Sequence, residues 1–589
     1  MKRFWMLEVD LSTGESKRTE VTGLFEKWLG GTGVATKLLV DNCPPDIDPY
    51  SPQAPVIFAI GPLNNVFPVI TKTAALFKSP LTGDLGESHA GGRLSLALYE
   101  SGNHVLMLKG KAPSLSYVVI ENDTVLIKPC NSLKGMSALA TERVLRDNEQ
   151  GLGKRSIVRI GPAGERLSPM ACATVDSSRH FGRLGLGGVL GSKNIKALVV
   201  SGSRYWKIED KKKYNALYTR LFKEIVHSDS MAKYHDLGTA MNVIPLSKIN
   251  GLPTRNFSQG FFEGADKISG EEFATTRLAQ QIACAGCQIG CIHVATLREA
   301  FNQAHHMYKT LKVSYDHELI YAWGSNLSID STDMILKLLQ AVEKQGWDGI
   351  SMGVTMAWAT EAFQRGLITE RETDGLILNF GDGEVYLKVL NRIAQGTNEF
   401  FQSLEKGASF CAKKYGGEDF AIAFNANEAP GYSTGPFAFL GYATGVRHSH
   451  LDNAGYSIDQ KALTTSMSFE DAIKEMYDEG VWRMVMNSLV ACLFARKVYD
   501  VKTICEALDS VGIEWSTEQI KEFSHRLHGL KFLFKEKCGF TFDKLALPEK
   551  LTRVYMSNGK IDQVMFKRGL ELYRGYVESD KEMARSEMP

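Results

Sequence analysis

Three cysteines stand close together near the middle of the chain, in the run Cys284-Ala-Gly-Cys287-Gln-Ile-Gly-Cys291. Thiolates two and three residues apart on one tight loop can each reach a different corner of an iron–sulfur cluster. The glycines within the run allow the backbone to fold closely around such a group. The spacing therefore favours an iron–sulfur cluster, with a fourth ligand that comes from elsewhere in the chain.

Other interpretations of the three cysteines are less favoured. Four thiolates suit a structural zinc site, but zinc modules usually contain two separated Cys-x-x-Cys pairs, and this chain has no second pair. The order Cys-x2-Cys-x3-Cys is the reverse of the order in radical enzymes that use S-adenosylmethionine, which disfavours radical chemistry. Zinc and three unligated cysteines remain as alternatives.

Composition restricts the class of protein. At 589 residues the chain is too long for one core, and we expect two to four domains. Lys plus Arg number 68 and Asp plus Glu number 67, so net charge indicates neither a nucleic acid nor a membrane surface as partner. No apolar run reaches the roughly 18 residues of a spanning helix, and Glu8 and Asp10 lie where a signal peptide needs an apolar core. Ten cysteines are too sparse for a disulfide scaffold, so we expect a reducing cytoplasm.

The elements that must position the cysteines differ between the two parts of the chain. Up to about residue 204 the apolar segments are short, rich in β-branched residues and separated by Gly, Pro, Asn and Asp, which indicates a sheet-dominated domain. Beyond residue 205 long segments show helical periodicity, and Gly346 and Gly366 lie where C-caps are expected. Expected strands are 4–9, 56–60, 105–108, 117–120, 156–160 and 195–200, and expected helices are 211–226, 332–345, 353–365 and 469–477.

The predicted fold class is α+β, with a β-rich N-terminal domain at 1–204 followed by two mainly α-helical domains at 205–410 and 411–589. Glycines cluster in the N-terminal domain at 30–33, 91–92 and 182–191. Glycine loops let backbone N–H groups approach phosphates closely, although packing turns are the commoner reason for glycine. No GxGxxG follows a strand in a βαβ unit and no GxxxxGK[ST] is present, so dinucleotide and P-loop sites are weakly supported.

Several separated stretches together resemble the aldehyde:ferredoxin oxidoreductase family, over essentially the full length of the chain. Members of that family carry tungsten, sometimes molybdenum, in a bis-pyranopterin cofactor beside a [4Fe-4S] cluster. The shared order and spacing of the stretches make the resemblance specific. The stretches are Trp28-Leu-Gly-Gly-Thr-Gly-Val, Ile60-Gly-Pro-Leu, Lys78-Ser-Pro-Leu-Thr-Gly, His89-Ala-Gly-Gly, Ile160-Gly-Pro-Ala-Gly-Glu, Gly191-Ser-Lys-Asn-Ile-Lys-Ala, the cysteine run, Asp348-Gly-Ile-Ser, Gly441-Tyr-Ala-Thr and Asn487-Ser-Leu-Val-Ala-Cys492-Leu-Phe.

The resemblance implies a ligand set for the cluster and two pterin-binding motifs. The fourth cluster ligand matches Cys492, which would otherwise be read as core packing. The first pterin motif matches Asp348 to Ser351; without the resemblance, a helix N-terminus is an equally good interpretation of Asp348. The second motif, which runs through Ala491, begins with Asn487 where the family has Asp. An amide offers one acceptor oxygen and adds donors, so we expect binding of the second pterin to be weaker or differently arranged.

The resemblance also implies residues around the rest of the cofactor. An arginine bridges pterin and cluster in the family, and Lys72 stands at the matching position; lysine keeps the charge but lacks the planar fork. A magnesium ion joining the pterin phosphates takes backbone carbonyls that match His89 and the region of His180 and Phe181. The residues expected to lie against the cofactor beside them are Gly91, Gly92, Gly182, Arg183 and Gly185.

Two residues are candidates for proton chemistry. Glu318 matches the family's active-site glutamate and His450 its histidine if one residue is gapped, whereas without the gap His448 is nearer. Taken alone, Glu318 would be a helix-face carboxylate and His450 a hydrogen-bonded surface residue. Some members bridge their dimer by a metal on a Glu-x-x-His pair; Lys337 and Gln340 stand there instead, so no bridging metal is expected.

The expected activity is oxidation of an aldehyde to a carboxylic acid, with electrons passing through the cluster to ferredoxin or an iron–sulfur partner subunit. One alternative keeps the cofactor but reduces a carboxylate or conjugated thioester within a larger complex. Another is a non-catalytic iron–sulfur protein that relays electrons. We expect a cytoplasmic enzyme with a small aldehyde or carboxylate substrate, assembled as a homodimer or larger complex.

Overall fold

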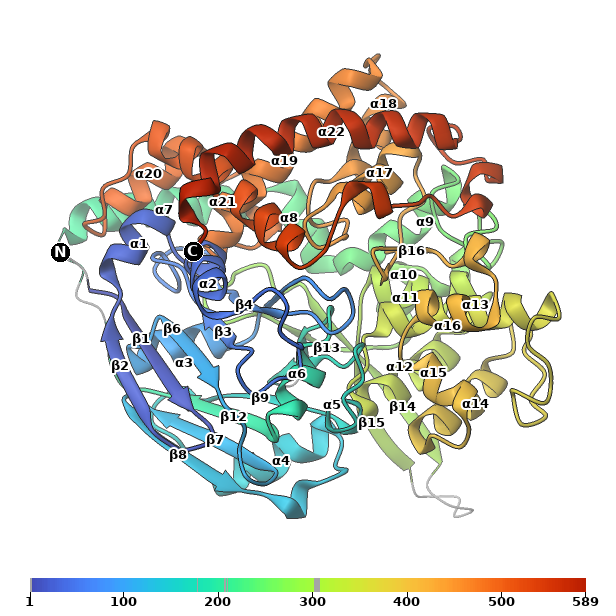
Figure 1. Ribbon diagram of the computed structural model, residues 1–589, viewed down its shortest axis with the longest axis horizontal. Helices are drawn as coiled ribbons and strands as arrows, with labels where there is room; N and C mark the ends of the chain where they lie inside the picture. The colour runs from blue at the N-terminus through green and yellow to red at the C-terminus, as the bar shows by residue number, and fades with distance from the viewer. Residues whose placement is uncertain (1–2, 177, 206–207, 209, 301–307) are drawn as a thin grey trace.

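Two six-stranded sheets form the N-terminal part of the protein in the computed structural model, which describes residues 3–176, 178–205, 208, 210–300 and 308–589 (Figure 1). The first sheet has the order β2-β1-β6-β3-β4-β5 and the second β11-β10-β9-β12-β7-β8. The strands of the first sheet are β1 (Trp5–Asp10), β2 (Ser16–Glu20), β3 (Val56–Ala59), β4 (Thr73–Lys78), β5 (Leu85–Ala90) and β6 (Val105–Lys109). Those of the second are β7 (Ser116–Glu121), β8 (Thr124–Pro129), β9 (Ser156–Ile160), β10 (Ala173–Val175), β11 (Arg179–Phe181) and β12 (Ile195–Ser201).

Alternation along the strands explains how the first sheet is buried on both faces. Successive side chains point to opposite faces of a strand. In β1, Leu7 and Val9 join an apolar core shared with the second sheet, including Leu198 of β12. Met6, on the other face, joins the large core that extends into the helical part of the chain. The N-terminal sheets are therefore packed against each other and against the helices, and the predicted β-rich domain and all six expected strands are confirmed.

Helices dominate the rest of the chain, as expected. Helix α12 ends at Gln345, and Gly346 closes it with a left-handed φ of 75°. Two other predicted helices are longer in the structure, because buried residues continue their periodicity. The helices used below are α7 (Lys211–Val226), α8 (Asp229–Asp236), α11 (His317–Trp323), α12 (Thr332–Gln345), α13 (Gly349–Gln364), α19 (Phe469–Ser488), α21 (Thr517–Lys537) and α22 (Gln563–Ala584).

The cysteine run lies in a setting that the sequence did not indicate. It connects two strands of a three-stranded antiparallel sheet of order β13-β14-β15, inside a region expected to be helical. The first strand, Leu-Ala-Gln-Gln-Ile, is short and polar with an exposed centre, so it carries little of the apolar alternation that predicts strands. The three strands are β13 (Leu278–Ile282), β14 (Ile292–Ala300) and β15 (Tyr308–Tyr315).

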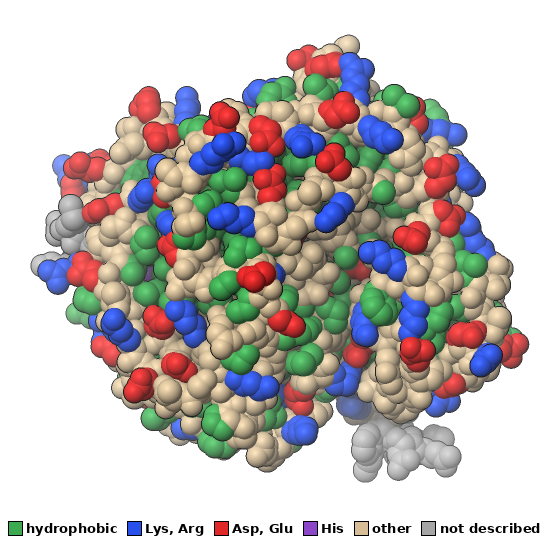
Figure 2. All heavy atoms as spheres, viewed as in Figure 1, with side chains coloured by type: hydrophobic (Ala, Val, Ile, Leu, Met, Phe, Trp, Pro, Cys, Tyr) green, Lys and Arg blue, Asp and Glu red, His purple; other side chains and the backbone are tan. Residues whose placement is uncertain are grey.

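None of the helices in the described part of the chain is both long and apolar enough to cross a bilayer. On the face drawn in Figure 2, acidic and basic side chains are interspersed, in keeping with a formal net charge of +1.

Candidate functional site

The cysteine run forms a tight loop at the surface end of β13 and β14. The Cys287 N–H donates to the Cys284 carbonyl at 3.0 Å, and the Ile289 N–H lies 3.4 Å from the Cys287 sulfur. Gly286 and Gly290 adopt φ values of 75° and 66°, which side-chain-bearing residues rarely adopt. These two glycines allow the tight turns that keep the three cysteines on one short loop.

Cys492 is brought to the same loop by a short segment of the N-terminal domain. The Val69 N–H donates to the Gly286 carbonyl at 3.3 Å, and the Cys492 N–H donates to the Val69 carbonyl at 3.0 Å. Ile70 forms a bridge with Ala491 immediately before that cysteine. The pairing of Cys492 with the cysteine loop therefore depends on backbone contacts among three distant parts of the chain.

The four cysteine thiols do not form a site for a single metal ion. Among the described residues no three His, Cys, Asp or Glu side chains converge as a single metal ion requires, whereas zinc would hold each sulfur at about 2.3 Å. Burial raises the pKa of Cys287 to about 11 and that of Cys291 to about 12, so each thiol needs positive charge nearby to ionise. At Gly91 a Cβ would lie 2.4 Å from the Cys284 sulfur, so this glycine leaves room for the thiol.

Glu318 and His450 lie together, away from the cysteine loop in sequence. Glu318 is in the first turn of α11, where one carboxylate oxygen accepts from the Gly431 N–H at 2.9 Å and the other is 3.5 Å from Nε2 of His450. Burial raises the pKa of Glu318 to about 8 and lowers that of His450 well below its usual value. At neutral pH the pair therefore carries a protonated carboxyl and a neutral imidazole.

His448, the other histidine considered, points elsewhere. Its Nδ1 is 3.0 Å from the Tyr442 carbonyl, and its Nε2 is 3.0 Å from Nζ of Lys535. Aromatic rings surround His450 instead, with Tyr432 at 5.3 Å and Tyr456 at 6.0 Å between ring centroids. Of the two, His450 is the histidine beside Glu318.

Asp348 both caps a helix and pairs with an arginine. One carboxylate oxygen accepts from the N–H groups of Ile350 and Ser351 at the start of α13, and the other lies 3.0 Å from Nε of Arg183. The same arginine donates through Nη2 to the Ser351 hydroxyl and to the Glu428 carbonyl. Helix capping and the charge pair together fix the orientation of Arg183.

Glu428 was not found from the sequence. Its carboxylate accepts from the Ala408 N–H at 2.9 Å, its second oxygen has no partner in the described part of the chain, and burial raises its pKa to about 7. No motif surrounds it, since the run Asn-Glu-Ala-Pro-Gly resembles an ordinary turn. Only the fold brings this carboxylate next to Arg183.

The remaining predicted residues flank this centre. His89 on β5 is 2.8 Å from Glu87, which in turn pairs at 2.5 Å with Lys531 of α21. His180 on β11 is 2.8 Å from Glu343 of α12. The amide of Asn487, in the last turn of α19, has no hydrogen-bond partner within the described residues.

Unpaired polar atoms mark where a further group fits. Buried polar atoms are almost always hydrogen-bonded, so each exception needs an explanation. Space is available there, because a Cβ at Gly182 would meet only the His180 Cβ, at 3.9 Å. A polar group rich in hydrogen-bond donors and acceptors would satisfy these atoms, as a pterin cofactor would. The unpaired atoms of the described residues in this region are Nη1 of Arg183, Oε1 of Glu318, Oδ1 of Asn427, Oε2 of Glu428 and Nδ1 of His450.

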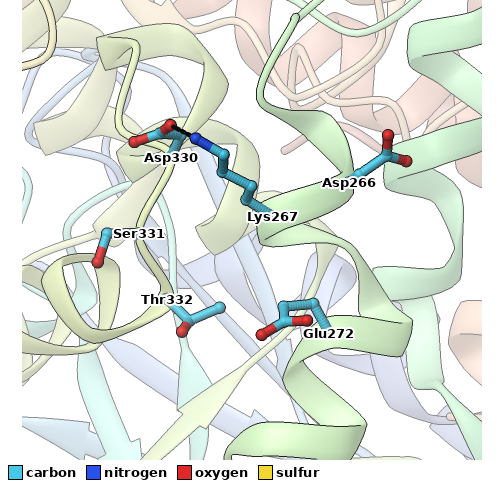
Figure 3. A pocket seen from close by; sticks show the side chains of 6 residues that line it. All are labelled: Asp266, Lys267, Glu272, Asp330, Ser331 and Thr332. Carbon is cyan, nitrogen blue, oxygen red and sulfur yellow. Dashed lines mark hydrogen bonds and ion pairs between the residues drawn. The ribbon is translucent and has the colours of Figure 1, made fainter.

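A separate surface pocket of about 450 Å³ shares no residue with this centre (Figure 3). Lys267 reaches across it to Asp330 at 2.6 Å. Its other lining side chains are polar, and two of them, Ser331 and Thr332, stand at the start of α12. The pocket therefore adds nothing to the redox centre.

Comparison with known proteins agrees with the arrangement. The model of the aldehyde ferredoxin oxidoreductase N-terminal domain matches residues 6–202, and the model of domains 2 and 3 of the same enzymes matches residues 216–580. The tungsten-containing aldehyde ferredoxin oxidoreductase of Pyrococcus furiosus is 31% identical over 98% of this chain and 96% of its own length. An aliphatic sulfonate oxidoreductase WOR-like subunit of the same organism is 28% identical over 66% of this chain and 64% of its own.

A solved structure supports the fold alone. The active-site complex BamBC of benzoyl coenzyme A reductase, solved with 1,5-dienoyl-CoA, superimposes with a TM-score of 0.80 over 99% of this chain and 98% of its own, at 20% identity. The two family models together cover nearly the whole chain. The protein is therefore an oxidoreductase that belongs to the aldehyde ferredoxin oxidoreductase family.

Proposed function

We propose that this protein oxidises an aldehyde to a carboxylic acid and passes the electrons through an iron–sulfur cluster to ferredoxin or a similar carrier. The observation that carries the proposal is the buried Glu318–His450 pair, which lies among unpaired polar atoms. Perturbed acid–base pairs of this kind are typical of catalytic sites. The full-length relatives named as tungsten-containing aldehyde ferredoxin oxidoreductases support the same reaction.

The cofactors follow from the donors available. Cys284, Cys287, Cys291 and Cys492 would hold a [4Fe-4S] cluster. A tungsten or molybdenum bis-pyranopterin would supply two-electron redox chemistry when bound. Further cofactor contacts would come from Lys72, Gly91, Gly92, Gly182, Arg183, Gly185, Asp348, Ser351, Asn487 and Ala491, with magnesium on the carbonyls of His89, His180 and Phe181.

The overall reaction is RCHO + H₂O → RCOO⁻ + 3H⁺ + 2e⁻. Glu318, once deprotonated, accepts a proton from water or from the aldehyde hydrate. His450 is neutral and its unpaired Nδ1 can donate a hydrogen bond to the substrate oxygen on which negative charge develops. The rings of Tyr432 and Tyr456 beside His450 keep water away from this proton transfer.

Replacement of Glu318 by Gln tests the assignment. Glu318→Gln keeps the shape but cannot accept a proton, so we expect aldehyde-dependent reduction of a viologen dye to fall by about 10² to 10⁴-fold. Iron and tungsten contents should stay at the wild-type values. Glu370→Gln, at an exposed carboxylate, is the matched control and should keep full activity.

Three results would contradict the proposal. Near-normal turnover in Glu318→Gln would show that Glu318 is not the catalytic base. A wild-type protein with about four iron atoms and neither tungsten nor molybdenum would instead be an electron relay. Dye-driven reduction of a carboxylate or conjugated thioester, without aldehyde oxidation, would identify a reductase. Oligomeric state, cytoplasmic location and domain boundaries at 204 and 410 remain predictions.

A further inference from the structure

Arg179 is a half-buried cation whose guanidinium has no partner among the described residues. It begins β11 and pairs with Val175 of β10 through the backbone. Its guanidinium makes no hydrogen bond or ion pair with any residue that the structure describes. Arginine keeps its charge at every accessible pH and presents five donors. A charge of this kind, held away from bulk water, requires a counter-charge.

The counter-charge that the fold offers Arg179 is the cysteine site. The position of a Cβ on Gly91 would lie 2.4 Å from the Cys284 sulfur and 3.7 Å from Nε of Arg179, so one glycine separates the thiol from the guanidinium. At Gly92 a Cβ would lie 3.7 Å from Cγ of the same arginine. The Arg179 side chain therefore runs along Gly91 and Gly92 toward the cysteine loop.

The charges around Arg179 agree with this geometry. Burial alone would lower its pKa, but the thiols of Cys284, Cys291 and Cys492 and the carboxylate of Asp316 outweigh that effect and hold the pKa above its ordinary value. Asp176, the nearest acid in sequence, is already used by the Arg93 N–H at 2.7 Å and the Ser156 hydroxyl at 3.0 Å. Once ionised, the cysteine thiols are thus the main source of negative charge that acts on Arg179.

Lys72 approaches the same region from another segment. Its backbone N–H donates to the Val490 carbonyl at 3.1 Å, which places its Cα beside the loop before Cys492. Arg179 is among the charges that act most strongly on the Cys291 thiol.

We propose that Arg179 is the positioning charge that sets the reduction potential of the iron–sulfur cluster. Reduction adds one negative charge to the cluster, and a fixed cation against its ligands stabilises the reduced form. Charge near a cluster and hydrogen bonds to its sulfurs are established determinants of potential. The proposal rests on the cluster that the proposed function assigns to the four cysteines.

Redox titration of the cluster, followed by electron paramagnetic resonance of the anaerobically purified enzyme, tests the proposal. Arg179→Gln should make the reduced form less favoured by about tenfold, which for a one-electron couple is a downward shift of about 59 mV. Arg179→Lys keeps the charge and should stay nearer to the wild-type potential. Arg143→Gln, at an exposed arginine of the N-terminal domain, is the matched control and should leave the cluster potential unchanged.

Each outcome decides between charge and packing. An unchanged potential in Arg179→Gln with full iron content would overturn the proposal, as would an equal shift in Arg143→Gln. If Arg179→Gln loses its iron, retention of four iron atoms by Arg179→Lys would support a role for the positive charge. Loss of iron from Arg179→Lys as well would overturn the proposal. Absence of iron from the wild-type protein would contradict the proposed function itself, so the two failures can be told apart.

Discussion

At the scale of single residues, Glu318 and His450 are each held in the uncharged form by the same surroundings. A carboxyl and an imidazole 3.5 Å apart would ordinarily form an ion pair near neutral pH. Here burial favours the neutral form of both, because it raises the pKa of the acid and lowers that of the base. Glu318 can therefore lose a proton and become negatively charged, whereas His450 stays neutral.

This asymmetry predicts the pH dependence of turnover. If deprotonated Glu318 is the base, kcat/KM for aldehyde oxidation should rise with pH through an apparent pKa of about 8 and then level off. His450 should contribute no ionisation between pH 6 and 9, because its pKa lies below that range. The measurement is a dye-coupled pH–rate profile of the holoenzyme. An ionisation near pH 6.5 that disappears in His450→Gln would contradict the assigned protonation states.

Residue-level prediction from the sequence depended on spacing and motif. The three neighbouring cysteines were evident from two short intervals, while Cys492, Glu318 and His450 required the resemblance. Glu428 and Arg179 were missed, because neither stands in a local pattern and each approaches the site only through tertiary contacts. The choice of His450 over His448 likewise required the fold, since only Ser449 separates the two histidines in sequence.

At the scale of elements, α21 carries two lysines into the protein interior. Lys531 and Lys535 are four residues apart and so share one face of the helix. Lys531 pairs with Glu87 at 2.5 Å, and Lys535 lies 3.2 Å from Asp84, while all four side chains are at most 3% exposed. Burial alone would raise the pKa of Glu87, but Lys531 and His89 outweigh it and hold that pKa well below its usual value. The helix is thereby locked against the hairpin that carries His89.

Removal of one partner of this buried pair should be costly. Lys531→Met leaves the Glu87 carboxylate buried and uncompensated, so we expect a loss of about 3 to 5 kcal/mol in stability, seen as a lower Tm by calorimetry. The double variant Lys531→Met with Glu87→Gln removes both charges and should recover most of the Tm. Lys213→Met, in an exposed ion pair with Asp509, is the control and should change Tm little. Equal Tm values for wild type and Lys531→Met would refute the role of the pair.

Because the Glu87 pKa is depressed, this pair stabilises the fold above the ordinary carboxyl pKa, and the contribution is lost as pH falls toward the depressed value.

Elements were predictable where their own side chains determine them. Helix α7 and strand β9 have the predicted bounds, because apolar periodicity and flanking breakers coincide there. Strands β13 to β15 were missed, because β13 is polar and its pairing with β14 depends on a connection through the cysteine loop.

At the scale of the whole molecule, the redox centre is assembled from segments far apart in sequence. The cysteine loop accepts a hydrogen bond from Val69 and donates one from Ala285 to the Gly92 carbonyl, both in the N-terminal domain. Cys492 and Val490 approach the same segment from the C-terminal part of the chain. Cys492 thus comes from a segment far in sequence from the other three cysteines. The cluster would therefore act as a cross-link among three parts of the chain, in addition to its redox role.

Removal of the iron should for this reason loosen a defined set of backbone segments. A structural metal contributes its binding free energy to folding, and local opening follows when it is withdrawn. We expect hydrogen exchange of the iron-depleted protein to become at least tenfold faster at 69–72, 284–291 and 490–492. The β7–β8 hairpin, at the far edge of the second sheet, is the internal control and should exchange at the wild-type rate. Acceleration confined to 284–291 would show that local turns alone hold the loop. We expect exchange in all three segments to accelerate together, because the Val69 N–H and carbonyl connect the loop to Cys492.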